Sequence, residues 1–140
     1  MNISISVFTA RDYEKAIALW KSCEGIGLSG ADSRSNIESF LCRNPNTNLV
    51  AYDGELMVGA VLCGSDGRRG YIYHLAIHPK YRNQNIGRML ITRCTQSLRA
   101  MGTQKCHLFI FNQNNNGKDF WKKMGWYYRD DINVFSKDLI

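Results

Sequence analysis

The sequence predicts an α+β fold in which a central mixed, mostly antiparallel, twisted sheet is flanked by about four helices. Two observations carry this prediction. Apolar runs at 48–52 and 55–64 are joined by Asp53-Gly54, a pair typical of a tight antiparallel hairpin. Later, a strand pattern, a helical pattern and another strand pattern follow one another over 71–111, which indicates a parallel crossover. Early hairpins with a late crossover predict a mixed sheet.

The first third of the chain predicts one strand and two helices. Residues 3–8 alternate apolar and polar side chains, as a half-buried strand does. Asp12 stands where an N-cap or a first-turn acid would begin a helix. After a glycine-rich loop, a second helix over 33–44 stops before Pro45. The apolar stripe expected on the first helix consists of Ile17, Trp20 and Cys23.

The rest of the chain alternates strands and helices. A strand at 71–77 is ended by Pro79, and Gly102 is placed to cap the end of the long helix that follows. The remaining expected elements are that helix at about 86–101, a strand at 105–111, a helix at 115–123, and two short strands near 126–129 and 132–138.

Composition bounds the class of protein. A chain of 140 residues with 44% hydrophobic content predicts one globular domain over 1–140. The sequence contains no apolar run of about 18 residues and no signal-peptide pattern, so a cytoplasmic protein with no membrane span is expected. The five cysteines form no CxxC pair and do not join the three histidines at metal-ligand spacing, so free thiols and no metal site are expected.

The net charge of +6 is spread along the chain. Its basic residues form several small groups, without the alternation of basic and aromatic residues that marks an RNA-binding strand pair. Nucleic acid is therefore not the expected partner. Instead, Arg82, Gly87 and Arg88 gather where a polar loop meets the long helix. A helix N-terminus carries unpaired N–H groups and partial positive charge, so this junction predicts a site for a phosphorylated ligand.

The strand at 71–77, the loop Tyr81 to Gly87 and the late segment Asn114 to Trp126 together resemble the GNAT superfamily of acyl-CoA-dependent N-acetyltransferases. The resemblance covers about residues 3–138 and is closest to a small bacterial branch. The family loop reads Gln/Arg-x-x-Gly-x-Gly/Ala, and this chain reads Arg82-Asn83-Gln84-Asn85-Ile86-Gly87. Asn85 replaces the first glycine, and asparagine tolerates left-handed backbone angles better than most residues.

The resemblance implies acetyl-CoA as cosubstrate and a sheet splayed between the fourth and fifth strands. The main chain of Leu75, Ala76 and Ile77 would pair with the pantetheine arm, and the N–H of Leu75 would polarise the thioester carbonyl. The pyrophosphate would lie on the loop and the helix N-terminus. The other residues implied in cofactor binding are Arg82, Asn83, Gln84, Asn85, Ile86, Gly87, Arg88, Asn114, Gly117 and Trp121.

The last helix departs from the family pattern Asn-x-x-Ala-x-x-x-Tyr-x-x-x-Gly-Phe. Asn114, Gly117 and Trp121 align with its first three named positions, and Gly125 and Trp126 with its last two. The family tyrosine often protonates the departing thiolate, and an indole N–H has no useful acidity near neutral pH. Trp121 would then pack against the cofactor; alternatively, Trp121 and Trp126 are core aromatics.

The general base is not evident, because neither 71–77 nor 105–111 contains an Asp or Glu. Tyr73 is favoured, as a residue that holds a water. Strand alternation predicts that Tyr71, Tyr73 and Leu75 share one face and His74 the other. The other candidates are Tyr71 through water, His107, His74, Glu24 and a water chain alone.

The acceptor site is expected in the loop from Glu24 to Arg34, with Glu24 and Leu28 as binding residues. The resulting hypothesis is an N-acetyltransferase that moves an acetyl group from acetyl-CoA to a primary amine of a small molecule or protein by direct attack. The alternative is a catalytically weak or inactive CoA-binding module that acts as a sensor or regulator. A homodimer is a further candidate, because dimers are common in such folds.

Overall fold

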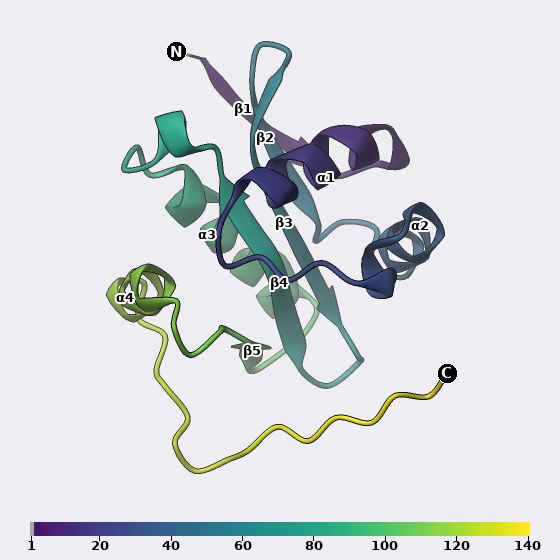
Figure 1. Ribbon diagram of the computed structural model, residues 1–140, viewed down its shortest axis with the longest axis vertical. Coiled ribbons are helices and arrows are strands. Elements are labelled where there is room, and N and C mark those ends of the chain that lie inside the picture. Colours follow the sequence, from purple (N-terminus) through teal and green to yellow (C-terminus); the bar gives the residue numbers. More distant parts are fainter. Residues whose placement is uncertain (1) are drawn as a thin grey trace. The chain divides into compact units, whose positions relative to one another are not determined.

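The computed structural model describes residues 2–140 and divides them into two compact units, one ending at Phe109 and one beginning at Ile110. Each unit is described by itself. The first unit contains a five-stranded sheet in the order β1-β2-β3-β4-β5 (Figure 1). Neighbouring strands are antiparallel except β4 and β5, which are parallel. The strands are β1 (Ile3–Val7), β2 (Leu49–Asp53), β3 (Leu56–Ser65), β4 (Gly70–Ile77) and β5 (Cys106–Leu108).

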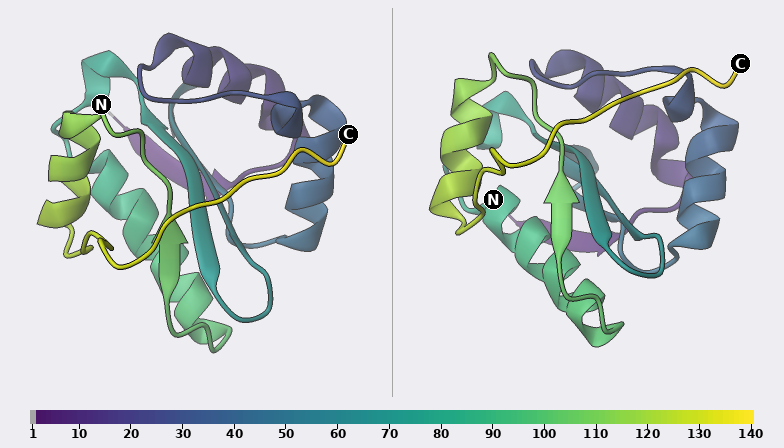
Figure 2. Two further views of the ribbon diagram at one scale, coloured as in Figure 1. Left: turned by 60° about the horizontal axis from the view of Figure 1, so that its bottom comes forward. Right: turned by 90° about the horizontal axis from the view of Figure 1, so that it is seen from below.

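Helices lie on both faces of this sheet (Figure 2). The helices α1 (Tyr13–Ser22) and α2 (Arg34–Arg43) cover one face, and α3 (Ile86–Ala100) covers the other. Three short 3-10 turns, η1 (Ala10–Asp12), η2 (Gly30–Asp32) and η3 (Pro79–Tyr81), join the elements. Within residues 2–140, no helix has the length and apolar content needed to cross a membrane. The expected α+β class with a mixed, mostly antiparallel sheet is therefore confirmed.

The core on the α1 and α2 face is built around Trp20, which is fully buried. Trp20 belongs to one cluster with Phe8, which follows β1, and with apolar side chains from α1, α2, β2, β3 and β4. The expected stripe faces this cluster, since Trp20 and Cys23 are buried in it and Ile17 packs against it; Ala16 and Leu19 of α1 are buried as well. Asp12 is the N-cap residue of α1, as expected, but its side chain makes no capping hydrogen bond. Its carboxylate instead accepts the Thr9 N–H at 2.8 Å and the Tyr52 hydroxyl at 2.6 Å.

The opposite face buries one side of α3. Five of its buried side chains are apolar or thiol groups: Ile86, Leu90, Ile91, Cys94 and Leu98. Close packing there needs Gly70 on β4, because a Cβ at that position would lie 2.6 Å from Leu98 Cδ1. The helix ends as predicted at Gly102, which has a φ of 87° and lies in a turn closed by the Thr103 N–H and the Leu98 carbonyl at 3.0 Å.

A β-bulge interrupts β4. The register passes from Ala60↔Ala76 to Leu62↔Tyr73, so His74 and Leu75 together face Val61. His74 has a φ of 54°, the left-handed region in which residues other than glycine are uncommon. The bulge shifts the side-chain alternation by one residue.

The expectation that His74 lies on the face opposite Tyr73 is therefore wrong. The His74 ring lies 5.1 Å from the Trp20 ring, and Tyr73 packs against the same α1 and α2 cluster. Leu75 and Ile77 are two residues apart in the strand, so their side chains point to the same face, and that of Ile77 lies near Leu90 of α3. Leu75 thus falls on the other face, because alternation holds only where the strand is regular.

β5 is much shorter than the strand expected over 105–111. Its parallel pairing with β4 runs from Gly70↔Cys106 to Ile72↔Leu108 and ends there. The five residues from Tyr73 to Ile77 therefore have no registered partner on β5. This is the opening between the fourth and fifth strands that was expected.

The second unit contains one helix, α4 (Asn115–Lys123), at the predicted bounds. Asn114 caps it by accepting the Gly117 N–H at 2.9 Å. The strands expected near 126–129 and 132–138 do not form; the described chain beyond Gly125 contains no helix or strand. A strand needs a ladder partner, and this unit contains no sheet. The single domain expected over 1–140 stays a prediction.

A buried polar network joins the end of α2 to the start of β2. Asn48 is fully buried; its amide donates to the Asn44 carbonyl and accepts the Cys63 N–H, both at 2.8 Å. Asn44 accepts the Ser65 N–H at 3.0 Å, and the Thr47 hydroxyl donates to the Cys63 carbonyl. These side chains satisfy backbone groups that the sheet ladder leaves unpaired.

Asn48→Ala should lower the free energy of unfolding by about 2–4 kcal/mol, because it leaves a buried N–H and a buried carbonyl without partners. Urea denaturation measures this loss. Asn46→Ala, at an exposed position two residues away, is the matched control and should stay within about 0.5 kcal/mol of the wild-type value. Equal stability of the two variants would contradict the structural role of the network.

Candidate functional site

The loop before α3 presents backbone N–H groups. Asn83 and Asn85 have φ values of 62° and 66°, so two residues adopt left-handed angles within three positions. Asn85 is the N-cap of α3, and its side chain does not cap the helix. The first intrahelical bond runs from the Met89 N–H to the Asn85 carbonyl at 2.9 Å. The N–H groups of residues 86–88 thus have no intrahelical acceptor, which suits an anion.

Two contacts hold this loop to the rest of the first unit. The Tyr81 hydroxyl donates to Asp53 Oδ2 at 2.6 Å, which ties η3 to the β2–β3 hairpin. This hydrogen bond lowers the pKa of Asp53 and raises the pKa of Tyr81. The His78 ring accepts the Lys80 N–H at 3.1 Å and packs edge-on against Tyr81. These contacts hold the start of the loop, at His78 to Tyr81, in place.

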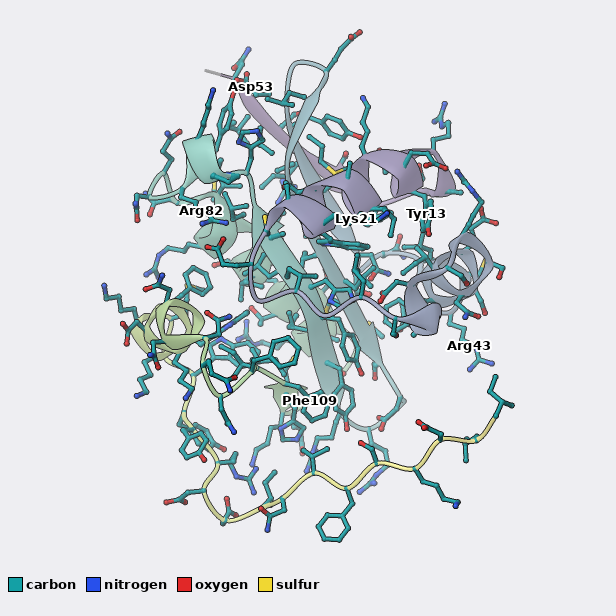
Figure 3. All side chains as sticks on the ribbon, viewed as in Figure 1. Tyr13, Lys21, Arg43, Asp53, Arg82 and Phe109 are labelled. Carbon is teal, nitrogen blue, oxygen red and sulfur yellow. The ribbon has the colours of Figure 1, made fainter. Side chains whose placement is uncertain are left out.

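Arg82 turns back toward the strand from which the loop leaves (Figure 3). Its Nε donates to the Ile77 carbonyl at 3.1 Å, and its Nη1 donates to Glu24 Oε1 at 3.2 Å. Hydrogen bonds from the backbone N–H of Glu24 and from Arg82 lower the pKa of Glu24. Glu24, expected as an acceptor residue, therefore pairs with a residue of the cofactor loop. Arg88 and Gln84 are exposed.

The free edge of β4 exposes main-chain groups. The His78 N–H donates to the Val58 carbonyl of β3 at 2.8 Å. Since successive residues of a strand direct their N–H groups to opposite edges, the Ile77 N–H faces the edge that β5 leaves open. The Ala76 side chain, one residue before Ile77, is buried in the cluster on the α1 and α2 face. An extended ligand could hydrogen-bond to the main chain at this edge, as an added strand would.

The peptide between His74 and Leu75 is oriented from the core. The Trp20 indole N–H donates to the His74 carbonyl at 2.7 Å. A trans peptide directs its C=O and N–H oppositely, and no cis peptide occurs in residues 2–140. The Leu75 N–H therefore points away from Trp20. This is the N–H expected to polarise a carbonyl, and a fully buried side chain fixes its direction.

A histidine–carboxylate pair lies beside this peptide. His74 Nε2 is 2.8 Å from Asp32 Oδ1, and the two side chains are 17% and 8% exposed. Asp32 Oδ2 accepts the Ser29 N–H at 3.0 Å, and the Asp32 carbonyl accepts the Tyr13 hydroxyl at 2.7 Å. Sequence reasoning missed this pair. The spacing Ser29-x-x-Asp32 signals a capping box, but no pattern connects Asp32 to a residue 42 positions later.

Aromatic side chains continue along β4 and β5 on the same face. The Tyr73 ring stacks on Tyr71 and meets Phe40 of α2 edge-on, with centroids 6.3 and 6.1 Å apart. Tyr71 also lies near His107 and Phe109 (Phe109 is labelled in Figure 3). Burial raises the pKa of Tyr73, so its phenol stays protonated at neutral pH. Tyr73 can hold a water, but it is a poor proton acceptor.

The structure brings together some of the expected acceptor residues and separates others. Leu28 packs against the α1 and α2 cluster, whereas Glu24 is engaged by Arg82. Asp32 is buried and bonded to His74, and Arg34 pairs with Glu14. No group of three or more His, Cys, Asp or Glu side chains within residues 2–140 is arranged to hold a metal ion.

In the second unit, Asn114 and Gly117 form one capping contact. A Cβ at Gly117 would lie 2.7 Å from both Asn114 Nδ2 and Ile110 Cδ1, which explains glycine where the family pattern has alanine. The Trp121 ring meets Trp126 edge-on at 4.9 Å and Phe120 at 5.1 Å. Both tryptophans are partly exposed, so neither belongs to a closed core.

The chain matches the model of the acetyltransferase (GNAT) family over residues 13–126. Acetyltransferases of Sodalis glossinidius and Photorhabdus laumondii are 33% and 34% identical to it; each alignment covers 99% of this chain and 96% of the relative. The crystal structure of PaiA N-acetyltransferase from Thermoplasma acidophilum with coenzyme A has the same fold, with a TM-score of 0.75 at 20% identity over 88% of each chain. The chain therefore belongs to the GNAT family of acetyltransferases.

Proposed function

We propose that this protein transfers an acetyl group from acetyl-CoA to a primary amine of a small molecule or protein by direct attack. One observation carries the proposal: an uncapped helix N-terminus at α3 follows directly from the open edge of β4. The pyrophosphate of acetyl-CoA would lie at the helix N-terminus. Its amide-bearing arm would lie along the open edge of β4. When bound, it would supply the activated acetyl group. The name of the PaiA N-acetyltransferase supports a nitrogen atom as the acceptor.

Each part of the first unit has a role in this proposal. The backbone N–H groups of residues 83–88 hold the pyrophosphate, with Arg88 near the phosphates. Arg82 joins them by exchanging its bond to Glu24 for one to phosphate. The main chain of Leu75, Ala76 and Ile77 holds the arm. The Leu75 N–H, fixed by Trp20, stabilises negative charge on the acetyl oxygen during attack.

The resemblance to the family implies roles for three residues of the second unit. Asn114 and Gly117 of α4 would meet the arm, and Trp121 would pack beside it. An indole does not donate a proton to a thiolate at neutral pH. This chain therefore releases sulfur as thiolate or protonates it through water.

The alternative is a CoA-binding module with little or no turnover. The observations that favour it are the tryptophan at position 121 and the absence of a carboxylate on β4 and β5. Turnover with any amine decides between the two. We further propose a cytoplasmic location, because all five cysteines are free, which suits a reducing compartment. A homodimer stays a prediction.

Gly87→Val should weaken acetyl-CoA binding at least about tenfold, because Gly87 is buried in the first turn of α3 and a branched side chain there would displace the N–H groups proposed to hold the phosphates. Isothermal titration calorimetry with acetyl-CoA measures the affinity. Thr92→Val places the same side chain at an exposed position of the same helix and should bind like wild type. Unchanged affinity in a folded Gly87→Val protein would contradict the loop assignment.

Asn85 can be tested by two substitutions at one position. Asn85→Gly should retain acetyl-CoA affinity, since glycine adopts the observed φ of 66° without strain. Asn85→Val should lose stability by about 1–2 kcal/mol and bind more weakly, because a branched residue is strained at left-handed angles. Thermal unfolding and calorimetry provide the two readouts. Equal behaviour of both variants would mean that the left-handed turn is not needed.

Trp121→Tyr should increase turnover if position 121 serves the departing thiolate, because a phenol can give up its proton. Release of free thiol from acetyl-CoA in the presence of an accepted amine measures the rate. Trp121→Phe is the control, since it also shrinks the ring but has no hydroxyl. A gain shared by both variants would assign the effect to space rather than to proton transfer.

A further inference from the structure

The hydrogen bond between Asp32 and His74 has a defined donor and acceptor. Asp32 Oδ2 is occupied by the Ser29 N–H, and Oδ1 lies 2.8 Å from His74 Nε2. An ionised carboxylate only accepts hydrogen bonds, so Nε2 must carry the proton. In a neutral ring, the lone pair then belongs to Nδ1. Asp32 thus selects one tautomer of His74.

The other ring nitrogen faces solvent. Nδ1 has no hydrogen-bond partner among residues 2–140, and that part of the chain contains no buried polar side-chain atom without a partner. Nδ1 is therefore accessible to a ligand although the ring as a whole is largely buried. A histidine that is oriented through one nitrogen and open at the other is the arrangement used for proton transfer in catalytic triads.

The position of the ring fits this role. His74 precedes Leu75, whose N–H is the donor proposed for the acetyl oxygen, and both share the peptide that Trp20 fixes. The ring lies on the sheet face covered by α1 and α2. Asp32, in the loop over 24–34, contacts the ring on this face. The ring contacts the Asp32 carboxylate through Nε2 and packs against the Trp20 ring, with centroids 5.1 Å apart.

Two other candidate bases are weakened by their surroundings. Glu24 bonds to Arg82 and to its own backbone N–H, which lowers its pKa and makes it a poorer proton acceptor. Tyr73 keeps its proton because burial raises its pKa. His74 is the remaining residue of β4 that offers an unshared basic nitrogen.

We propose that His74 is the general base of the acetyl transfer, with Asp32 as its positioning residue. This inference rests on the proposed function. Nδ1 takes one proton from the ammonium form of the acceptor, and the freed nitrogen lone pair attacks the carbonyl carbon of the thioester. A C–N bond forms, the C–S bond breaks, and the second proton lost by nitrogen passes to the leaving sulfur. The His74 imidazolium, stabilised by Asp32, then releases its proton to solvent.

The tautomer can be measured without any substrate. Long-range ¹H–¹⁵N correlation spectra of histidine-labelled protein distinguish a protonated Nδ1 from a protonated Nε2. We expect Nε2–H in wild type. In Asp32→Asn, the amide oxygen keeps the Ser29 N–H and the amide NH₂ faces Nε2, so the ring should switch to Nδ1–H. A protonated Nδ1 in the neutral wild-type ring would overturn the proposal.

Kinetics test the role of Nδ1. His74→Gln keeps a donor toward Asp32 but has no basic nitrogen, so kcat should fall about 100-fold or more, while acetyl-CoA affinity is retained. His74→Gly suits the left-handed angles and leaves room for a ring, so added imidazole should restore part of its turnover. Acetyl-CoA with a panel of small primary amines and short peptides is the assay. Asp32→Asn should lose as much kcat as His74→Gln.

Tyr13→Phe is the matched control, because it removes the hydrogen bond to the Asp32 main-chain carbonyl but leaves the Asp32 carboxylate and the His74 ring unchanged (Tyr13 is labelled in Figure 3). It should lower stability, keep the Nε2–H tautomer and show no response to imidazole. A kcat for His74→Gln within about twofold of wild type, or no imidazole rescue of a folded His74→Gly, would refute the base role. Failure of wild type to bind acetyl-CoA, or binding without turnover, would instead remove the proposed function and the base assignment with it.

Discussion

The β-bulge at His74 is the constraint on which the other features of the site depend. One extra residue on β4 exchanges the two faces of the strand for every residue that follows. It turns a carbonyl toward Trp20, so a buried indole rather than a neighbouring strand satisfies that group. It also lets two consecutive residues, Tyr73 and His74, occupy the same side of the sheet. A regular strand would have placed the histidine against α3 and left Asp32 without its partner.

The left-handed angle of His74 is costly for a residue with a side chain, and the surrounding contacts hold it in place. Trp20 binds the backbone of this residue and Asp32 binds its ring, so opposite ends of one amino acid are fixed by α1 and by the loop after it. Strain of this kind persists only where neighbouring structure determines it. The loop over residues 24–34 and β4 are consequently held to each other, although they are far apart in the sequence.

Most of the architecture could be predicted from the sequence, because helices and hairpins are determined by local patterns. The long helix, its glycine end and the Asp53-Gly54 turn lay where periodicity and turn chemistry put them. The bulge could not be predicted, since an alternating strand contains no local signal for an inserted residue. The length of β5 depends on where its partner stops pairing, which its own residues do not determine. The tail after Gly125 has strand-like composition, but a strand forms only beside a partner strand. The residues of the tail do not determine whether such a partner is present.

Of the candidate site, the cofactor loop could be read from its motif and the Asp32–His74 pair could not. Asn85 was expected to tolerate left-handed angles, and it adopts them. The pairing of Arg82 with Glu24 and Ile77 is a tertiary contact across 58 and 5 residues, for which spacing gives no indication. The role proposed for His74 likewise depends on the sheet face that its side chain occupies. The strict alternation of a regular strand predicted the wrong face, because the bulge interrupts it.

The distribution of the free cysteines determines how the protein responds to oxidants. Only a thiolate reacts readily. The hydrogen bond that the Cys63 thiol makes to Cys94, together with burial, raises the pKa of Cys63, and burial raises the pKa of Cys106 to about 12. Of the five cysteines, Cys42 near the end of α2 is the exposed one. Sulfenic acid or a mixed disulfide would therefore form first on a helix remote in sequence from the cofactor loop. Oxidation of the exposed thiol would therefore leave the residues of the cofactor loop chemically unchanged.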